Sequence, residues 1–194
     1  TYTAVNNSTI AIQIASGNYN LCTTLATYMT ELFYGNSSFN SDISFWDMSN
    51  VTNTDRMFQG ASSFNQNIGG WNTSKFYDVS GMFKSASRFN QDIGSWDTSR
   101  IANMAEMFND ASSFNQDLKG WCVSNIASEP GAFAGNTSAL TNANKPLWGY
   151  CPSSFSINVT ASSASDYTLS GTDRIGAVSG NDPTVTINVG DTVN

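Results

Sequence analysis

The chain has 194 residues, of which 15 are acidic and 8 basic, giving a net charge of −7. Duplex binding needs clustered Lys and Arg, and the basic residues here are scattered singly, so the composition argues against a nucleic-acid partner. There is no uninterrupted apolar run of about 18 residues, so no membrane-spanning helix is expected. Histidine is absent, which removes the commonest general base and metal ligand.

Residues 1–35 are expected to form an N-terminal segment and cap. Within them, residues 23–35 (TTLATYMTELFYG) predict a helix that ends at a glycine. Its inward side chains would be Tyr28, Leu32 and Phe33.

Residues 36–126 hold four copies of a 25-residue unit whose period never slips. Each copy opens with a Phe-Asn pair, at Phe39, Phe64, Phe89 and Phe114. A fixed period of about 20–50 residues is typical of a solenoid, in which each unit buries its apolar face against its neighbours. This part of the chain is therefore expected to stack in coils.

One copy predicts the structure of a coil. The stretch from Ile93 to Trp96 is expected to be extended, and Ser99 is placed to cap a helix. Apolar residues spaced by three and four between Ile101 and Ala111 form one helical face. The expected fold class is an α/β repeat solenoid, with a short strand and a short helix in each coil and caps at its ends.

The runs FNQDIGSWDTSRIANMAEMFNDASSFNQDLKGW and SFWDMSNVTNTDRMFQGASSFNQNIGGWNTS share the rhythm F-N-x-x-I-x-x-W-[DN]-x-S-x-[IV]. They resemble the BspA-like, leucine-rich-repeat-related surface proteins of bacteria and other microbes. The resemblance covers about residues 33–151. It implies a leucine-rich-repeat-like solenoid that is extracellular, on a cell surface or on a virion surface, that adheres to proteins or cells and that is not an enzyme.

Two repeated rows have both a structural and a binding interpretation. Asparagines stacked about 4.8 Å apart predict a ladder in which each amide satisfies the next coil's backbone in a turn that excludes water, although a ligand-binding row is the alternative. The asparagines are Asn40, Asn65, Asn90 and Asn115. The tryptophans form either a buried spine or an exposed stripe for stacking sugars, the latter being a candidate binding face. They are Trp46, Trp71, Trp96 and Trp121.

Carboxylates also repeat in phase and form a candidate calcium site. Asp42, Asp92 and Asp117 share one phase, interrupted by an asparagine in the second copy. Oxygen ligands at such a spacing could hold Ca²⁺, whereas the asparagine relieves charge repulsion without any ion. No cofactor is otherwise expected. No catalytic constellation is found, and the protein is not expected to be an enzyme.

The three cysteines predict one disulfide. Cys22 and Cys122 lie four whole periods apart, roughly 19 Å along a stack, which is too far to bridge. Cys122 and Cys151 flank the last coil and its tail. Residues 127–151 are the predicted C-terminal cap, in which Trp148 covers the open apolar end. A bond between them indicates an oxidising compartment.

Residues 152–194 have a different composition and predict a partial all-β segment. Alternating apolar residues mark strands at 155–162 and 184–193. The pattern YTLSGTDRIGAVSGNDPTVTINVGDTVN resembles the start of a cupredoxin-like β-sandwich, without the His and Cys ligands that copper needs. An open sheet here would allow self-assembly through residues 155–194.

Together these features predict a non-enzymatic extracellular surface protein that presents a repeat face for adhesion to a protein or glycan on another cell or particle. One alternative is a structural subunit of an extracellular filament, sheath or virion coat. A second alternative is a carbohydrate- or calcium-dependent binding module.

Overall fold

The structure is a computed structural model that describes residues 1–135, 137–152, 158–163 and 166–170. The chain divides into two compact units, Thr1–Pro152 and Ser153–Asn194. None of the helices in the described part of the chain has the length and apolar character needed to cross a bilayer.

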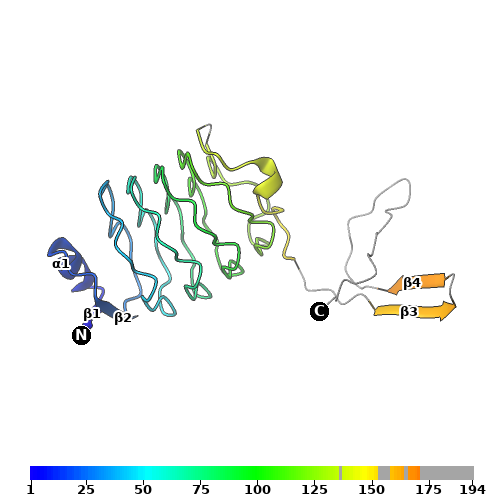
Figure 1. Cartoon of the computed structure of the whole chain (residues 1–194), viewed down its shortest axis with the longest axis horizontal. Coiled ribbons are helices and arrows are strands. Elements are labelled where there is room, and N and C mark those ends of the chain that lie inside the picture. The colour runs from blue at the N-terminus through cyan, green and yellow to red at the C-terminus, as the bar shows by residue number, and fades with distance from the viewer. Residues whose placement is uncertain (136, 153–157, 164–165, 171–194) are drawn as a thin grey trace. The chain divides into compact units, whose positions relative to one another are not determined.

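The first unit begins with a small strand-helix-strand element. Strand β1 (Thr3–Asn6) pairs in parallel with β2 (Leu21–Leu25), and helix α1 (Ile10–Ala15) lies between them in the chain (Figure 1). Val5, Ile10 and Leu21 from these elements are buried in the core. The element therefore covers the N-terminal end of the core.

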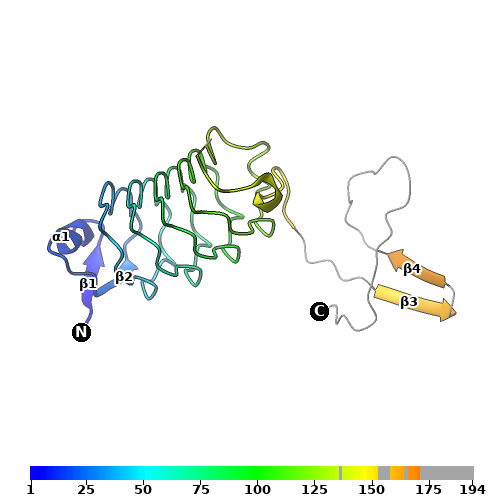
Figure 2. The ribbon, with the colours of Figure 1, turned by 45° about the horizontal axis from the view of Figure 1, so that its top comes forward.

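From residue 26 onward the chain forms loops that lie side by side (Figures 1 and 2). We call each loop a coil. Backbone hydrogen bonds join adjacent coils, for example from Met29 N–H to Asn53 O at 2.8 Å and from Phe58 N–H to Met82 O at 2.9 Å. Isolated parallel bridges follow the same register and link Tyr28 to Asn53, Asn53 to Asp78 and Asp78 to Asn103.

The predicted α/β repeat solenoid is wrong as a fold class, because the coils contain neither the expected helix nor the expected strand. Among the described residues from 26 to 141 the chain forms turns and irregular segments instead. Within the expected helix, Glu106 and Asp110 have φ values of 59° and 60°. A right-handed helix cannot include such left-handed residues. The predicted cap is also absent, since the Ser99 N–H and hydroxyl both donate to Asp97.

The helix expected at residues 23–35 is wrong for the same reason. Glu31 and Gly35 have φ values of 58° and 68°, and Tyr28, expected to point inward, is exposed. Phe33 is buried as expected. The N-terminal helix lies earlier in the chain, at α1.

The core consists largely of stacked aromatic rings. The centroids of Phe58, Phe83 and Phe108 are 5.7 Å apart from one coil to the next. Phe89, at the start of a copy, lies 4.0 Å from Phe83 with its ring nearly parallel. These rings are fully buried. Two phenylalanine phases, one at Phe58, Phe83 and Phe108 and one at the start of each copy, thus build a continuous aromatic column inside the coils.

The C-terminal end of the core is covered by the last part of the unit. Phe133 contacts the ring of Phe108 and in turn meets Trp148 edge-on at 4.9 Å. A short 3-10 helix, η1 (Asn142–Asn144), precedes Trp148, and a disulfide joins Cys122 to Cys151.

In the second unit, β3 (Asn158–Ser163) and β4 (Asp166–Ser170) form an antiparallel pair. Val159 lies opposite Leu169 in their register. The strand expected near residues 184–193 lies outside the described residues.

We predict that Phe89→Ala lowers the free energy of unfolding of the chain by about 3–5 kcal/mol, because it leaves a cavity in the aromatic column. Chemical denaturation followed by fluorescence measures this change. Tyr77→Ala is the matched control, since Tyr77 is exposed and its truncation should change stability little. Equal effects of the two substitutions would contradict the column as the main source of stability.

We predict that the double variant Cys122→Ser, Cys151→Ser loses about 2–4 kcal/mol, because the disulfide closes a loop with a sequence separation of 29. Thermal or urea unfolding under non-reducing conditions measures the loss. Cys22→Ser is the control, because Cys22 is an exposed free thiol. A double variant as stable as the parent would show that the bond does not hold this end of the core.

Candidate binding face

The tryptophans do not form an exposed stripe. All four side chains are at most 5% exposed, so the candidate binding face predicted at Trp46, Trp71, Trp96 and Trp121 is wrong. Each indole N–H donates to a backbone carbonyl of the preceding coil, as from Trp71 to Ile43 O at 3.2 Å and from Trp96 to Ile68 O at 3.1 Å. The indoles are structural, with their polar atom satisfied inside the protein.

The asparagines form a ladder along one side of the coils. Asn40 Oδ1 accepts the N–H of Asn65 at 2.9 Å, and Asn65 and Asn90 repeat this contact toward the following coil at 3.0 Å. Asn115 closes the ladder by accepting the N–H of Thr141. These side chains are exposed, so the turn does not exclude water. Their side-chain oxygens are nevertheless engaged by the backbone.

Aspartate and asparagine side chains fold the turns of each coil. In the row that contains Asp42, Asp92 and Asp117, each carboxylate accepts the N–H of the residue two positions later, and Asn67 makes the same contact. Such local side-chain contacts are typical of turns. They explain why either residue type fills the row.

The hydrogen bonds that hold these turns also lower the pKa of several carboxyls. The Ser44 and Lys119 backbone N–H groups are the largest cause of the lowered pKa of Asp42 and Asp117. At Asp97 the Ser99 hydroxyl is the largest cause, followed by its N–H. These carboxylates are therefore held in the ionised form by the turns that they close.

No cluster of the kind that would hold a metal ion lies within the described residues, because no group of three or more His, Cys, Asp or Glu side chains converges there. The candidate calcium ligands Asp42, Asp92 and Asp117 lie on successive coils, each bonded into its own turn. In this arrangement each carboxylate stabilises the turn of its own coil.

One surface of the coils, which we call the outer wall, carries side chains that vary from coil to coil. It comprises the outward-facing side chains of segments 28–34, 53–59, 78–84 and 103–109, which are the segments joined by the backbone hydrogen bonds. They are Tyr28, Thr30, Glu31 and Tyr34; Asn53, Asp55, Arg56 and Gln59; Asp78, Ser80, Gly81 and Lys84; and Asn103, Ala105, Glu106 and Asn109. Inward positions of the same segments repeat phenylalanine and apolar residues.

Polar contacts tie the outer wall together across the coils. Arg56 forms ion pairs with Glu31 at 3.1 Å and with Asp55 at 3.0 Å, and Lys84 pairs with Glu106. The Ser80 hydroxyl donates to Asp55 at 2.9 Å. The wall therefore presents a fixed pattern of both charges.

A shallow hollow interrupts the outer wall at Gly81. The equivalent positions in the adjacent coils carry Arg56 and Glu106, whose side chains line the hollow together with Lys84 and Ser80. Gly81 has a φ of 58°, and a Cβ added to it would lie 3.0 Å from Arg56 Cγ. The absent side chain makes room for the side chain of Arg56, which packs against this position.

The sequence does not predict the outer wall, because the predicted candidate sites are all positions that repeat between copies. A signal was available, because one phase holds residues that differ in charge and size, namely Tyr34, Gln59, Lys84 and Asn109. Residues that differ between otherwise equal coils are released from the packing that fixes the others. Exposed positions that differ between coils are thus the mark of this candidate surface in the sequence.

Comparison with known proteins gives one family. The family model described as "Mycoplasma protein of unknown function, DUF285" matches residues 27–146, more than half of the chain. No curated protein and no solved structure matches the chain.

We predict that Asp97→Asn makes the stability of the chain less sensitive to acid. The folded pKa of Asp97 is lowered, so its contribution is present above the unfolded value of about 3.9 and is lost as the pH falls through the folded pKa. Asparagine keeps an acceptor that does not titrate, as Asn72 does in the second copy. Urea unfolding at about pH 6 and about pH 3 measures the difference.

Asp97→Ala serves as the contrast to Asp97→Asn, because alanine removes the acceptor at every pH. It should lower the stability at both pH values. If the parent and Asp97→Asn lost the same stability on acidification, the Asp97 turn would not be the origin of the pH dependence.

Proposed function

We propose that this chain, which belongs to the family of unknown function that matches residues 27–146, is a non-enzymatic extracellular surface protein. It binds another protein through its outer wall. The observation that carries the proposal is the segregation of residues. Buried positions repeat from coil to coil, whereas exposed and half-buried positions of the outer wall differ between coils, as at Tyr34, Gln59 and Lys84.

The chemistry of the outer wall supports a protein partner. Tyr and Arg are enriched at the energetically important positions of protein interfaces, and exposed Tyr28 and Tyr34 lie in the same segment as Glu31, which pairs with Arg56. The ion pairs hold the side chains of Arg56 and Glu31 in place before binding, which lowers the entropic cost of ordering these two side chains. A sugar-binding surface of stacked indoles is not supported, because the tryptophans are buried.

The compartment follows from the cysteines. The disulfide between Cys122 and Cys151 favours a non-cytoplasmic protein. The proposal extends this to the cell surface or the extracellular space, in line with the resemblance to BspA-like surface proteins.

The non-enzymatic part of the proposal rests on the use of the ionisable groups. The chain contains no histidine, and carboxylates such as Asp42 and Asp97 close turns. Arg56 and Lys84 are engaged in ion pairs on an open surface. Such groups suit recognition better than acid–base chemistry.

We predict that the labelled chain binds saturably to at least one member of an array of purified extracellular proteins. The double variant Arg56→Gln, Lys84→Gln should weaken that binding at least about tenfold, because a few well-placed residues supply most interface energy. Surface plasmon resonance on the protein found in the array measures both affinities.

The matched control is Lys75→Gln, Lys119→Gln, which removes the same charge from exposed positions outside the outer wall. It should leave the affinity within about twofold at moderate salt, since distant exposed charges are screened. Equal losses in the two double variants would assign binding to net charge alone. Binding restricted to glycans on a parallel glycan array would replace the proposal with a carbohydrate-binding module.

A further inference from the structure

The hydrogen-bonded segments of the outer wall have a direction. In segment 53–59, the carbonyl oxygens of Asp55 and Met57 accept from the preceding coil. The N–H groups of Arg56 and Phe58 donate to the next coil. The carbonyl of one residue and the N–H of the following residue belong to one planar peptide group and point in opposite directions. Alternate peptide groups are therefore aligned, with oxygens toward the N-terminal end and N–H groups toward the C-terminal end.

Segment 28–34, the first segment of the outer wall, leaves its row of carbonyl acceptors uncovered. By register the acceptors are the carbonyl oxygens of Tyr28, Thr30, Leu32 and Tyr34, and within the described part of the chain no group donates to them. The rest of this end is closed. β1 pairs with β2, and the Asn7 side-chain oxygen accepts the N–H of Thr27 at 2.7 Å in place of a further coil.

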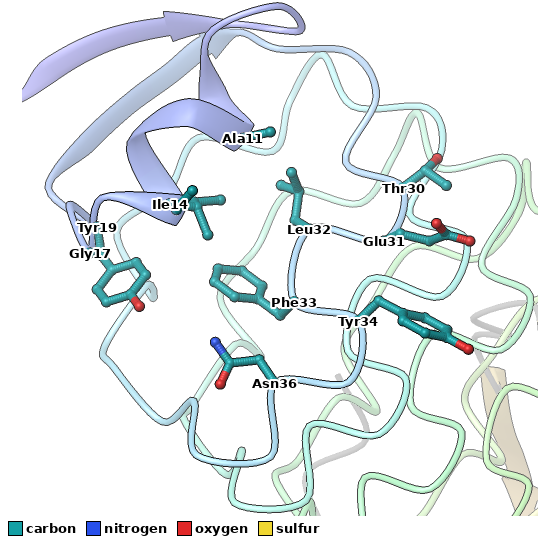
Figure 3. A pocket seen from close by; sticks show the side chains of 11 residues that line it. Ala11, Ile14, Gly17, Tyr19, Thr30, Glu31, Leu32, Phe33, Tyr34 and Asn36 are labelled. Atoms are coloured by element: carbon teal, nitrogen blue, oxygen red, sulfur yellow. The ribbon is translucent and has the colours of Figure 1, made fainter.

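Helix α1 stands beside this acceptor edge without covering it. Figure 3 shows an open pocket with Ala11 and Ile14 of α1 on one side and Leu32 and Phe33 on the other. Backbone acceptors are strong hydrogen-bonding groups that favour a donor partner. The edge is thus open to an approaching chain.

The opposite end of the wall presents donors. Gly131 O and Phe133 O accept from Glu106 N–H at 3.1 Å and Phe108 N–H at 2.8 Å. The following N–H groups, of Ala132 and Ala134, then point away from the coils, and no acceptor for them lies among the described residues.

The donor edge keeps the backbone form of the coils and carries small side chains. Ala132 has a φ of 51°, close to the 52° of Arg56 and the 59° of Glu106, which also donate in this ladder. Gly131 and Ala132 are exposed. Their size allows another backbone to come within hydrogen-bonding distance.

We propose that a second copy of this chain occupies the acceptor edge, with its Ala132 and Ala134 N–H groups donating to carbonyls between Tyr28 and Tyr34 of the first copy. An ordinary β-strand fits less well, because its edge alternates N–H and carbonyl groups and would place carbonyls against carbonyls. The donor edge of the same wall offers donors alone. The copies therefore join head to tail and continue the ladder.

A head-to-tail contact uses two different surfaces and leaves one of each free at the ends, so it extends into a row of copies. The net charge of −7 opposes this association at low ionic strength. Salt screens the repulsion, and the association should therefore strengthen with added salt.

Sedimentation of the full chain, carrying Cys22→Ser to exclude a disulfide between copies, tests the proposal. The weight-average mass should rise with protein concentration and with salt, and it should not level off at a dimer. A chain that stays monomeric over the whole range, or that stops at a dimer, overturns the proposal.

Two blocked variants test which edges meet. Ala11→Trp adds bulk beside the acceptor edge, and Gly131→Trp adds it on the donor edge, where an added Cβ meets no atom within 4 Å. Each should be monomeric alone, and their equimolar mixture should form dimers, because each supplies the edge that the other lacks. The matched controls are Ile12→Trp, on the exposed side of α1, and Gly70→Trp, which also has open space.

The controls should associate like the parent. Association that survives in both blocked variants, or that the controls abolish equally, rejects these edges as the contact. Thermal melts of all four variants show that each folds. This self-association is independent of the binding of another protein by the outer wall, so either proposal can fail alone.

Discussion

The backbone hydrogen bonds between adjacent coils are the constraint on which the rest of the unit depends. They tie Met29 to Asn53 and Phe58 to Met82, and they fix how far one coil lies from the next. Once that distance is set, the phenylalanine rings must stack at 5.7 Å, and each asparagine and indole must reach a neighbouring coil's backbone. The polar side chains of the outer wall acquire their ion pairs in the same way.

The repeat and its buried residues could be predicted from the sequence because they depend on period alone. The form of the backbone could not. Met104, Met107 and Phe108 follow one another at helical spacing and are buried. The backbone of the same segment is not helical, because Glu106 and Asp110 have left-handed conformations. Non-glycine residues at positive φ carry no clear mark in a sequence. The apolar pattern therefore predicts a helix where the chain makes turns.

The candidate site was missed for a related reason. Repetition attracts attention to asparagine, tryptophan and aspartate, and the structure uses these residues to satisfy backbone groups or to fill the core. The outer wall is marked by irregularity at positions such as Arg56 and Gly81, which only the fold shows to be neighbours on one surface. A repeated polar residue in this chain is better explained by a hydrogen bond that closes a turn than by the binding of a ligand.

Among the described residues, the hydrogen bonds of the outer wall lie within one coil or join adjacent coils, so a whole coil can be gained or lost as a genetic unit. Duplication or loss of one whole 25-residue copy would leave β1, α1 and the disulfide-linked end unchanged and would keep every ladder in register. An insertion of a single residue would instead shift all inward side chains of its coil. Genes for such chains can therefore change the length of the outer wall in fixed steps, while its two ends stay constant.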